Sequence, residues 1–407
     1  MMHRKIHILP FLALLLVTPV LSQSLLGFQY PFGMPQRGGS GTALSLAGTG
    51  TGIGNDFLGL TQNPANLGIT ARTTFSSTVS GDLLTLDESG KSSRHLDLGF
   101  RLISLSVPIG SFGALGVSVE PYSTSNVRFR YSEPLKDDAV LPDSAELGII
   151  EHGGAISWQV GWGYAILKKV RIGVAYRYLN FNHTLSKSRD SYGSLTDHSV
   201  DSTTTRFTTS GFRAGAQVPL GNFTIGVSGD YFLLNTAKSK RVIEGTLDTL
   251  VKSLSDSYDL KPPPAFSVGV SWQVDPRWLA AIDGGATLWD QYYSSGKKII
   301  PLNNAYYVSG GVQFIPAPNL LTPKLYEIIQ YRAGVRYTQL PSIEGIEVGG
   351  TLALGLPLLA TGGLFDIIFE YARRWDNRFE GYRENILSVK LGINGARKWY
   401  QSSDESY

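Results

Sequence analysis

The stretch AISWQVGWGYAI, residues 155–166, alternates between large apolar side chains and small or polar ones at almost every position. Trp158 and Trp162 share one phase, and Gln159 and Gly163 share the other. Successive side chains of a β-strand point to opposite faces, so this pattern predicts a strand with one apolar face and one small, polar face.

The same unit recurs along most of the chain, and only residues 167–169, which include Lys168 and Lys169, separate the first strand from the next, which predicts a tight hairpin. The alternation predicts strands near residues 74–80, 95–107, 113–131, 154–166, 170–184, 206–218, 222–240, 265–274, 278–293, 304–316, 327–338, 346–357, 363–375 and 385–394. A total of about fourteen is even, as expected for a bacterial outer-membrane barrel with both termini in the periplasm.

The connections between these strands alternate between short and long. The short ones lie near residues 108–113, 167–169, 219–222, 275–277, 317–325 and 358–363, and the long, polar ones near 81–94, 132–154, 185–205 and 241–264. A soluble β-sandwich also alternates, but short periplasmic turns with long outer loops are typical of a membrane barrel. Aromatic residues at strand ends, such as Tyr178, Trp278 and Tyr337, fit the interfacial girdles of such a barrel.

The N-terminus has the three-part layout of a secretory signal: Arg4 and Lys5, an apolar run to Leu21, and small Ser22 before a cleavage site. The run is shorter than the roughly 20 residues that span a membrane as a helix. We therefore expect a signal peptide over residues 1–22, a segment folded inside the barrel over 23–72, a transmembrane barrel over 73–394 and a periplasmic tail over 395–407.

The composition excludes several kinds of site. The chain has no Cys, and hence no disulfide, thiolate metal site or Cys nucleophile. Its formal charge of +3 falls to about +1 without Arg4 and Lys5, which gives no electrostatic reason to expect nucleic acid. The mature His residues have no metal-pair spacing, and Asp197-His198 lacks the third member of a catalytic triad. We expect no catalytic residue, metal or cofactor; since some barrels are proteases or lipases, an enzyme is kept as the minor alternative.

The glycine-rich run GTGTGIG, residues 48–54, could suggest a phosphate-binding loop. Such a loop needs a preceding strand, a following helix and a Lys or acidic partner, none of which the sequence provides. The alternative is a backbone that packs closely against the barrel wall.

The run NPANLG, residues 63–68, together with residues 41–60, resembles the N-terminal hatch of the FadL family of outer-membrane transporters. The resemblance implies an all-β fold, a transmembrane antiparallel β-barrel of about 14 strands with the hatch inside its lumen, and places Asn63, Pro64, Ala65 and Asn66 in that hatch. It also implies passive uptake of hydrophobic molecules such as long-chain fatty acids across the outer membrane.

The C-terminal third resembles the PorV-like branch of the same family, which implies an alternative role in binding or shuttling secreted proteins. The matching motifs are Gly355-Leu356-Pro357, Phe365-Asp366, Glu370-Tyr371, Arg383-Glu384-Asn385, Leu391-Gly392 and Lys398-Trp399-Tyr400. Two departures weaken assignment to one branch: Arg374-Trp375 stands where an Arg-Gly pair is usual, and the tail runs on to Tyr407. As an outer-membrane barrel, the chain is expected to meet a hydrophobic small molecule, outer-membrane lipid and the barrel assembly machinery.

Charged residues on the polar phase must face the lumen, because Arg or Lys facing lipid at the midplane costs about 2–4 kcal/mol. Arg332 and Arg336 are candidates for contact with a ligand carboxylate, or else belong to a salt-bridge ladder that holds the hatch. A second candidate set lies in an outer loop at helical spacing and predicts a short amphipathic helix, which would either dock a greasy ligand or pack on its neighbours. This set is Leu247, Leu250, Val251 and Leu254.

A lateral opening in the barrel wall is expected at Ile103 and Pro121. Pro121 lies inside the third strand and cannot donate to the ladder. In the second strand the apolar phase slips between Phe100 and Ile103, which predicts a bulge. The FadL resemblance supports an opening at the same place. The alternative is that Pro121 merely ends the membrane-embedded part of a long strand.

Overall fold

The computed structural model describes residues 30–88, 91–134, 144–166, 169–192, 197–245, 252–295, 302–318, 323–341, 344–358, 362–379 and 381–397. The expected signal peptide, the first part of the expected hatch and most of the expected tail therefore lie outside the described residues. In the part that is described, no helix is long and apolar enough to cross a membrane.

Antiparallel strands make up nearly all of this structure. They are β1 (Met34–Pro35), β2 (Thr73–Glu88), β3 (Lys91–Pro108), β4 (Ala114–Thr124), β5 (Val127–Pro134), β6 (Ser144–Ile166), β7 (Val170–Tyr192), β8 (Asp197–Leu220), β9 (Phe223–Phe232), β10 (Asn235–Gly245), β11 (Lys252–Lys261), β12 (Ala265–Gln273), β13 (Trp278–Thr287), β14 (Tyr293–Ser294), β15 (Ala305–Phe314), β16 (Gln330–Gln339), β17 (Gly345–Leu358), β18 (Gly363–Asp376) and β19 (Arg383–Arg397).

The last strand pairs with the first strand of the wall, from Arg383 opposite Asp87 to Arg397 opposite Thr73, and this closes the barrel. Four barrel strands are each interrupted into two pieces: β4 with β5, β9 with β10, β12 with β11, and β13 with β14. Counted in this way the barrel has 14 strands, which confirms the predicted fold class. The wall starts at Thr73, and β19 continues to Arg397, three residues past Asn394.

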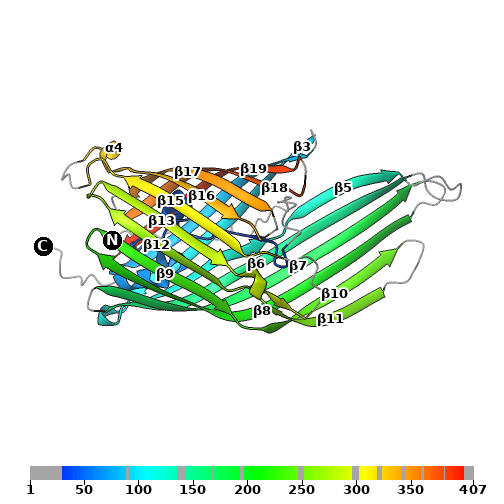
Figure 1. Cartoon of the computed structure of the whole chain (residues 1–407), viewed down its shortest axis with the longest axis horizontal. Helices are drawn as coiled ribbons and strands as arrows, with labels where there is room; N and C mark the ends of the chain where they lie inside the picture. The colour runs from blue at the N-terminus through cyan, green and yellow to red at the C-terminus, as the bar shows by residue number, and fades with distance from the viewer. Residues whose placement is uncertain are drawn as a thin grey trace, which may run out of the picture.

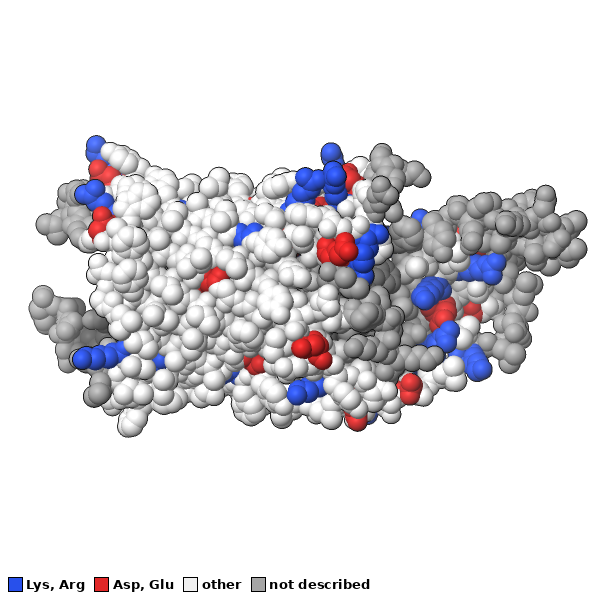
Figure 2. All heavy atoms as spheres, viewed as in Figure 1, with Lys and Arg blue, Asp and Glu red and all other residues white. Residues whose placement is uncertain are grey.

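The outer surface of the barrel is apolar, and the barrel portion in Figure 2 shows few charged atoms. Val335 and Leu352, for example, are 68% and 67% exposed. Exposed apolar side chains of this size and number are stable only against lipid, so the apolar phase of each strand faces the membrane. The small and polar phase faces inward.

The long polar loops expected near residues 81–94, 132–154, 185–205 and 241–264 are mostly strand. In the first of them, β2 runs to Glu88 and β3 begins at Lys91. The other three form a larger sheet. There β5, β6, β7, β8, β10 and β11 continue past the barrel as a sheet, which we call the extension, and Figure 1 shows it running beyond the ends of β3, β18 and β19. Outside the membrane both faces of a hairpin meet water, so it keeps its hydrogen-bonded ladder but loses the apolar alternation that marks a membrane strand.

The described part of the N-terminal segment, residues 30–72, forms short elements instead of a strand of the wall. These are α2 (Gly41–Ser45), α3 (Gly59–Gln62) and the 3-10 helix η3 (Pro64–Ile69). Further short helices lie in connections, η4 (Gly110–Phe112), η5 (Trp289–Gln291) and α4 (Leu325–Ile328).

Candidate functional site

The N-terminal segment lies against the inward phase of the wall, and Asn63 is one of its anchors. The Asn63 Nδ2 donates to the carbonyl oxygens of Ala216 at 3.2 Å and Val227 at 3.1 Å, on two different wall strands, and to Thr51 O at 3.0 Å. Its Oδ1 accepts from Ala65 N at 3.0 Å and so caps η3. One buried amide thus joins two turns of the segment to the wall.

The small residues of the inward phase provide the space that the segment needs. A Cβ added to Gly173 would lie 2.3 Å from the Pro64 carbonyl carbon, and one added to Gly226 would lie 2.0 Å from Thr51 O. Both contacts are with backbone, which cannot move aside cheaply. The alternation of large and small residues in the sequence therefore has two causes, lipid on one side and this close packing on the other.

The glycine-rich run at residues 48–54 packs against β8, β9, β12 and β13. Gly50 N and Thr51 N donate to Asp283 Oδ2 at 2.7 Å and 2.8 Å, and Ser271 Oγ donates to Gly52 O at 2.8 Å. The backbone amides that would cradle a phosphate are held by a carboxylate of the wall. The interpretation as a closely packed backbone is confirmed, and Asp283, an inward-facing charge by its phase, is the residue that binds this loop.

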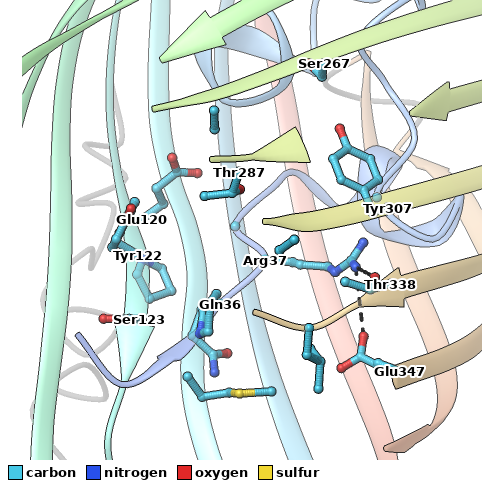
Figure 3. Close-up of a pocket in the computed structure, with 18 of the residues that line it drawn as sticks. Gln36, Arg37, Glu120, Tyr122, Ser123, Ser267, Thr287, Tyr307, Thr338 and Glu347 are labelled. Carbon is cyan, nitrogen blue, oxygen red and sulfur yellow. Dashed lines mark hydrogen bonds and ion pairs between the residues drawn. The ribbon is translucent and has the colours of Figure 1, made fainter. Parts of the chain in front are cut away.

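A cavity of about 380 Å³ remains in the lumen beside the N-terminal segment. Figure 3 shows Arg37 pointing into it between Tyr307, Thr338 and Glu347, with Glu120 and Tyr122 of β4 across the cavity. Both apolar and charged side chains line this space.

Most cations of the cavity wall are neutralised at close range. Arg213 forms a two-pronged ion pair with Asp230, at 2.6 Å and 2.8 Å, and Arg177 Nη1 reaches the same carboxylate at 2.9 Å. On the other side Lys390 pairs with Glu370. Buried pairs of this kind are costly to break, because removing one partner leaves a charge without compensation.

Arg37 differs from these cations. Its nearest carboxylate in the described structure is Glu347, at 3.9 Å, and Arg336 and Arg374 already pair with that group. Its side chain is 30% exposed, against 15% or less for the other paired cations that line the cavity, and it lies 5.8 Å from the Tyr307 ring centroid. Arg37 therefore has donors available to the cavity.

The two arginines predicted to contact a ligand carboxylate, Arg332 and Arg336, already form ion pairs with carboxylates of the wall. Arg332 Nη1 lies 2.6 Å from Asp366 Oδ1 and 3.2 Å from Ser45 Oγ of α2, and its side chain is 1% exposed. Arg336 bridges Glu347 at 2.9 Å and Glu370 at 2.6 Å. This geometry favours the salt-bridge ladder for Arg332, which contacts the N-terminal segment directly; Arg336 lines the cavity and its contact with a ligand stays a prediction.

A hydrophobic cluster lies at the end of the lumen toward the extension. Phe32 packs edge-on against Phe181 at 5.4 Å between centroids, and Phe207 and Phe232 belong to the same cluster with Tyr30 and Met34. The beginning of the described chain therefore occupies an apolar site at the mouth of the barrel.

The wall is incomplete between β3 and β4. These strands pair only from Ile103 opposite Val119 to Pro108 opposite Ala114. Beyond this stretch β3 continues to Lys91 beside β2 alone, and β4 continues to Thr124 beside β6. Beyond the pair of Ile103 with Val119, the facing edges of β3 and β4 are no longer hydrogen-bonded to each other. We call the space between these two edges the gap.

Both strands at the gap carry a bulge. In β3 the register with β2 shifts so that Arg101 is the extra residue between Phe100 and Leu102. In β4 the register with β6 shifts at Tyr122, directly after Pro121. The bulge predicted in the second strand is confirmed, and Pro121, Glu120 and Arg101 all line the lumen cavity, which therefore reaches the gap.

Residues 34–39, which we call the bridging segment, cross the gap on the lumen side. Met34 and Pro35 form β1 and pair with Thr124 and Ser123 of β4, and Gln36 N donates to Tyr122 O at 3.0 Å. Gly39 N donates to Arg101 O of β3 at 3.4 Å. The bridging segment thus binds both edges of the gap.

The amphipathic helix predicted around Leu250 is not the structure at its described end. Leu254 lies in β11, opposite Arg241 of β10, and is 44% exposed; Leu247, Leu250 and Val251 lie outside the described residues. Helical spacing also arises by chance in a serine-rich strand exposed on both faces. Among the described residues no cluster of His, Asp and Glu could hold a metal ion.

Comparison with known proteins identifies the fold and a family. A family model described as BamG matches residues 2–404. A Pseudomonas aeruginosa FadL homologue superimposes with a TM-score of 0.66 at 14% identity, covering 90% of this chain and 100% of that one. The P. putida toluene transporter TodX gives 0.59 at 12%, covering 91% and 100%, and the Ralstonia pickettii toluene transporter TbuX gives 0.59 at 12%, covering 89% and 99%. No curated protein sequence matches the chain.

Proposed function

The chain belongs to the BamG family and has the fold of a FadL-like outer-membrane barrel, and from this premise we propose that it takes up hydrophobic molecules across the outer membrane without covalent chemistry. The solved relatives with this fold include transporters of toluene, a hydrophobic compound. The observation that carries the proposal is the gap between β3 and β4, because the lumen cavity reaches this break in the pairing of the wall.

In this proposal a ligand enters the mouth cluster, reaches the cavity and leaves sideways through the gap at Ile103 and Pro121. An apolar molecule gains free energy from the membrane beside the barrel, whereas an aqueous exit below the barrel would expose its surface to water again. In the described structure the bridging segment crosses the gap, so the exit requires that residues 34–39 leave the edge of β4.

The finer proposal concerns the ligand class. Arg37 presents a guanidinium with incomplete charge compensation to the cavity, beside the apolar ring of Tyr307. A carboxylate is the natural partner of such a group, and a long-chain fatty acid combines it with an apolar chain. Replacing Arg37 with Gln should weaken uptake of a labelled fatty acid more than uptake of toluene; equal effects on both would exclude Arg37 as a carboxylate site.

A disulfide tests the exit directly, because the chain has no Cys of its own. Met34 and Thr124 are partners across an antiparallel pair, where Cα atoms lie about 4.5–5.5 Å apart, within the range of a disulfide. The variant Met34→Cys with Thr124→Cys should lose uptake into proteoliposomes when oxidised and regain it with reductant.

The matched control places a disulfide in the continuous wall, Val227→Cys with Val268→Cys, which are also cross-strand partners. Its uptake should not respond to oxidation. If the oxidised bridging-segment variant transports at the reduced rate, the ligand does not leave through the gap.

A second candidate function is association with the barrel assembly machinery, to which the family's name points. The extension supports it, since six strands that continue outside the membrane provide a surface beyond the needs of a pore. Uptake by the purified chain alone in proteoliposomes favours transport. Lack of uptake, together with stoichiometric co-purification of the central assembly barrel, favours the second function, and co-purification of secreted proteins instead favours the PorV-like role.

A further inference from the structure

The outer face of the extension carries a cluster of cations, Arg206, Lys238, Lys240 and Lys261, which we call the basic patch. Strand alternation shows which way they point. Arg206 follows buried Thr205 and precedes buried Phe207, Lys238 follows buried Ala237, and Lys261 follows buried Leu260. Phe207, Ala237 and Leu260 belong to the cluster at the barrel mouth, so the basic patch lies on the opposite face of the sheet.

These cations have no carboxylate partner among the described residues, where no Asp or Glu oxygen lies within 4.0 Å of them. Some other charges of the extension are paired, for example Arg241 with Asp201 at 2.5 Å and Arg130 with Glu146 at 3.5 Å. Arg206 and Lys238 are also direct cross-strand partners. Like charges directly opposite each other in a sheet repel, so an anion bound between Arg206 and Lys238 would offset this repulsion.

The position of the basic patch relative to the membrane indicates the source of that anion. Lys261 Nζ lies 3.0 Å from the Tyr231 hydroxyl, and Tyr231 itself is 48% exposed on the lipid-facing surface. Leu233 and Leu234, at the break between β9 and β10, are 44% and 53% exposed. Tyrosines with a lysine beside them are typical of the membrane interface, so the patch begins at the level of lipid headgroups.

The other cations of the basic patch lie farther along the strands, away from the membrane. Arg206 lies four residues beyond Ser210, whose hydroxyl hydrogen-bonds the Tyr176 hydroxyl at 2.6 Å, and four residues span about 13 Å along a strand. An acidic soluble protein would need no such alignment with the aromatic girdle.

Hydroxyl groups lie across the ladder from the two lysines of β10. Lys238 lies opposite Ser257, and Lys240 lies opposite both Ser255 and Thr204. Phosphate oxygens accept hydrogen bonds from ammonium, guanidinium and hydroxyl groups alike. We propose that the basic patch binds the phosphate groups of an anionic outer-leaflet lipid, between Arg206 and Lys238.

The test uses the full-length chain in neutral detergent and measures its binding of fluorescent lipid A, which carries two phosphates, and of the dephosphorylated lipid. The wild-type protein should prefer the phosphorylated form. The variant Arg206→Gln with Lys238→Gln should lose at least about tenfold in affinity for it, because each replacement removes a charge-assisted hydrogen bond.

The control variant, Lys187→Gln with Lys252→Gln, makes the same change in charge on the inner face of the extension, since both residues share the phase of that face. Its affinity should stay at the wild-type value, as should the heat-modifiable gel shift of every variant. Equal binding of both lipids, an equal loss in the control, or tighter binding of poly-glutamate than of lipid A would each overturn the proposal.

Discussion

The attachment of the N-terminal segment can be measured at Asp283. This residue of β13 is 2% exposed and accepts two backbone hydrogen bonds with one oxygen, from Gly50 N at 2.7 Å and Thr51 N at 2.8 Å. A hydrogen bond to a charged group contributes about 1.5–3 kcal/mol, so Asp283→Ala should lower the free energy of opening this loop by about 3–6 kcal/mol. Asp283→Asn keeps an acceptor without the charge and should cost less, about 1–2 kcal/mol.

Hydrogen exchange of the Gly50 and Thr51 amides in the inserted barrel reports this quantity. A loss of 3 kcal/mol corresponds to exchange on the order of 100-fold faster, since about 1.4 kcal/mol is a factor of ten. Asp275→Ala is a matched control, because Asp275 also accepts from two amides, Arg277 N at 2.7 Å and Trp278 N at 2.8 Å, but is exposed. If Asp283→Ala leaves both amides as protected as the control does, the carboxylate does not hold the loop.

Three further changes probe the segment and the gap. Deleting residues 41–68 should leave a heat-modifiable, inserted barrel with raised conductance in planar bilayers, because this part packs across the lumen; unchanged conductance would count against a plug. Gly173→Val should destabilise by about 1–3 kcal/mol or more in thermal melts, since its Cβ would lie 2.3 Å from the Pro64 carbonyl carbon, whereas Gly395→Val, with open space at the Cβ, should change little. Pro121→Val restores a donor and a β-former beside the gap and should reduce fatty-acid uptake at equal protein level; unchanged uptake would mean that Pro121 only ends the embedded part of β4.

The sequence predicted the membrane part of the fold well because lipid and the packed lumen impose opposite demands on alternate residues. Trp158 and Gln159 differ in kind for this reason, and the position of their strand follows directly. The strands of the extension were not predicted, because the alternation of apolar with small or polar residues disappears outside the membrane. Ser186 and Ser202, which hydrogen-bond across β7 and β8 at 2.9 Å, look like loop residues by composition.

Contacts between the N-terminal segment and the wall could not be predicted from the sequence, for a different reason. The gap could be located, since a proline and a slip of phase are local signals and both lie where β3 and β4 separate. Asp283 and Arg37 acquire their roles only from contacts with residues 233 and 310 positions away in the chain. A lone inward carboxylate, or an arginine in a glycine-rich segment, gives no sequence signal that distinguishes such a partner from any other.

The N-terminal segment is attached in two ways, and the difference bears on how a ligand would leave. Its later part is held by many buried bonds to separate strands, such as Arg213 Nη1 to Thr61 O at 2.5 Å and Thr351 Oγ1 to Ser45 O at 2.9 Å. The bridging segment has a two-residue strand and few further bonds at the edges of the gap. Segments with fewer buried contacts open at lower free energy, so residues 34–39 should exchange amide hydrogens faster than residues 49–66. The proposed exit would then open while residues 49–66 stay bound to the wall, and slower exchange at residues 34–39 would refute this order of events.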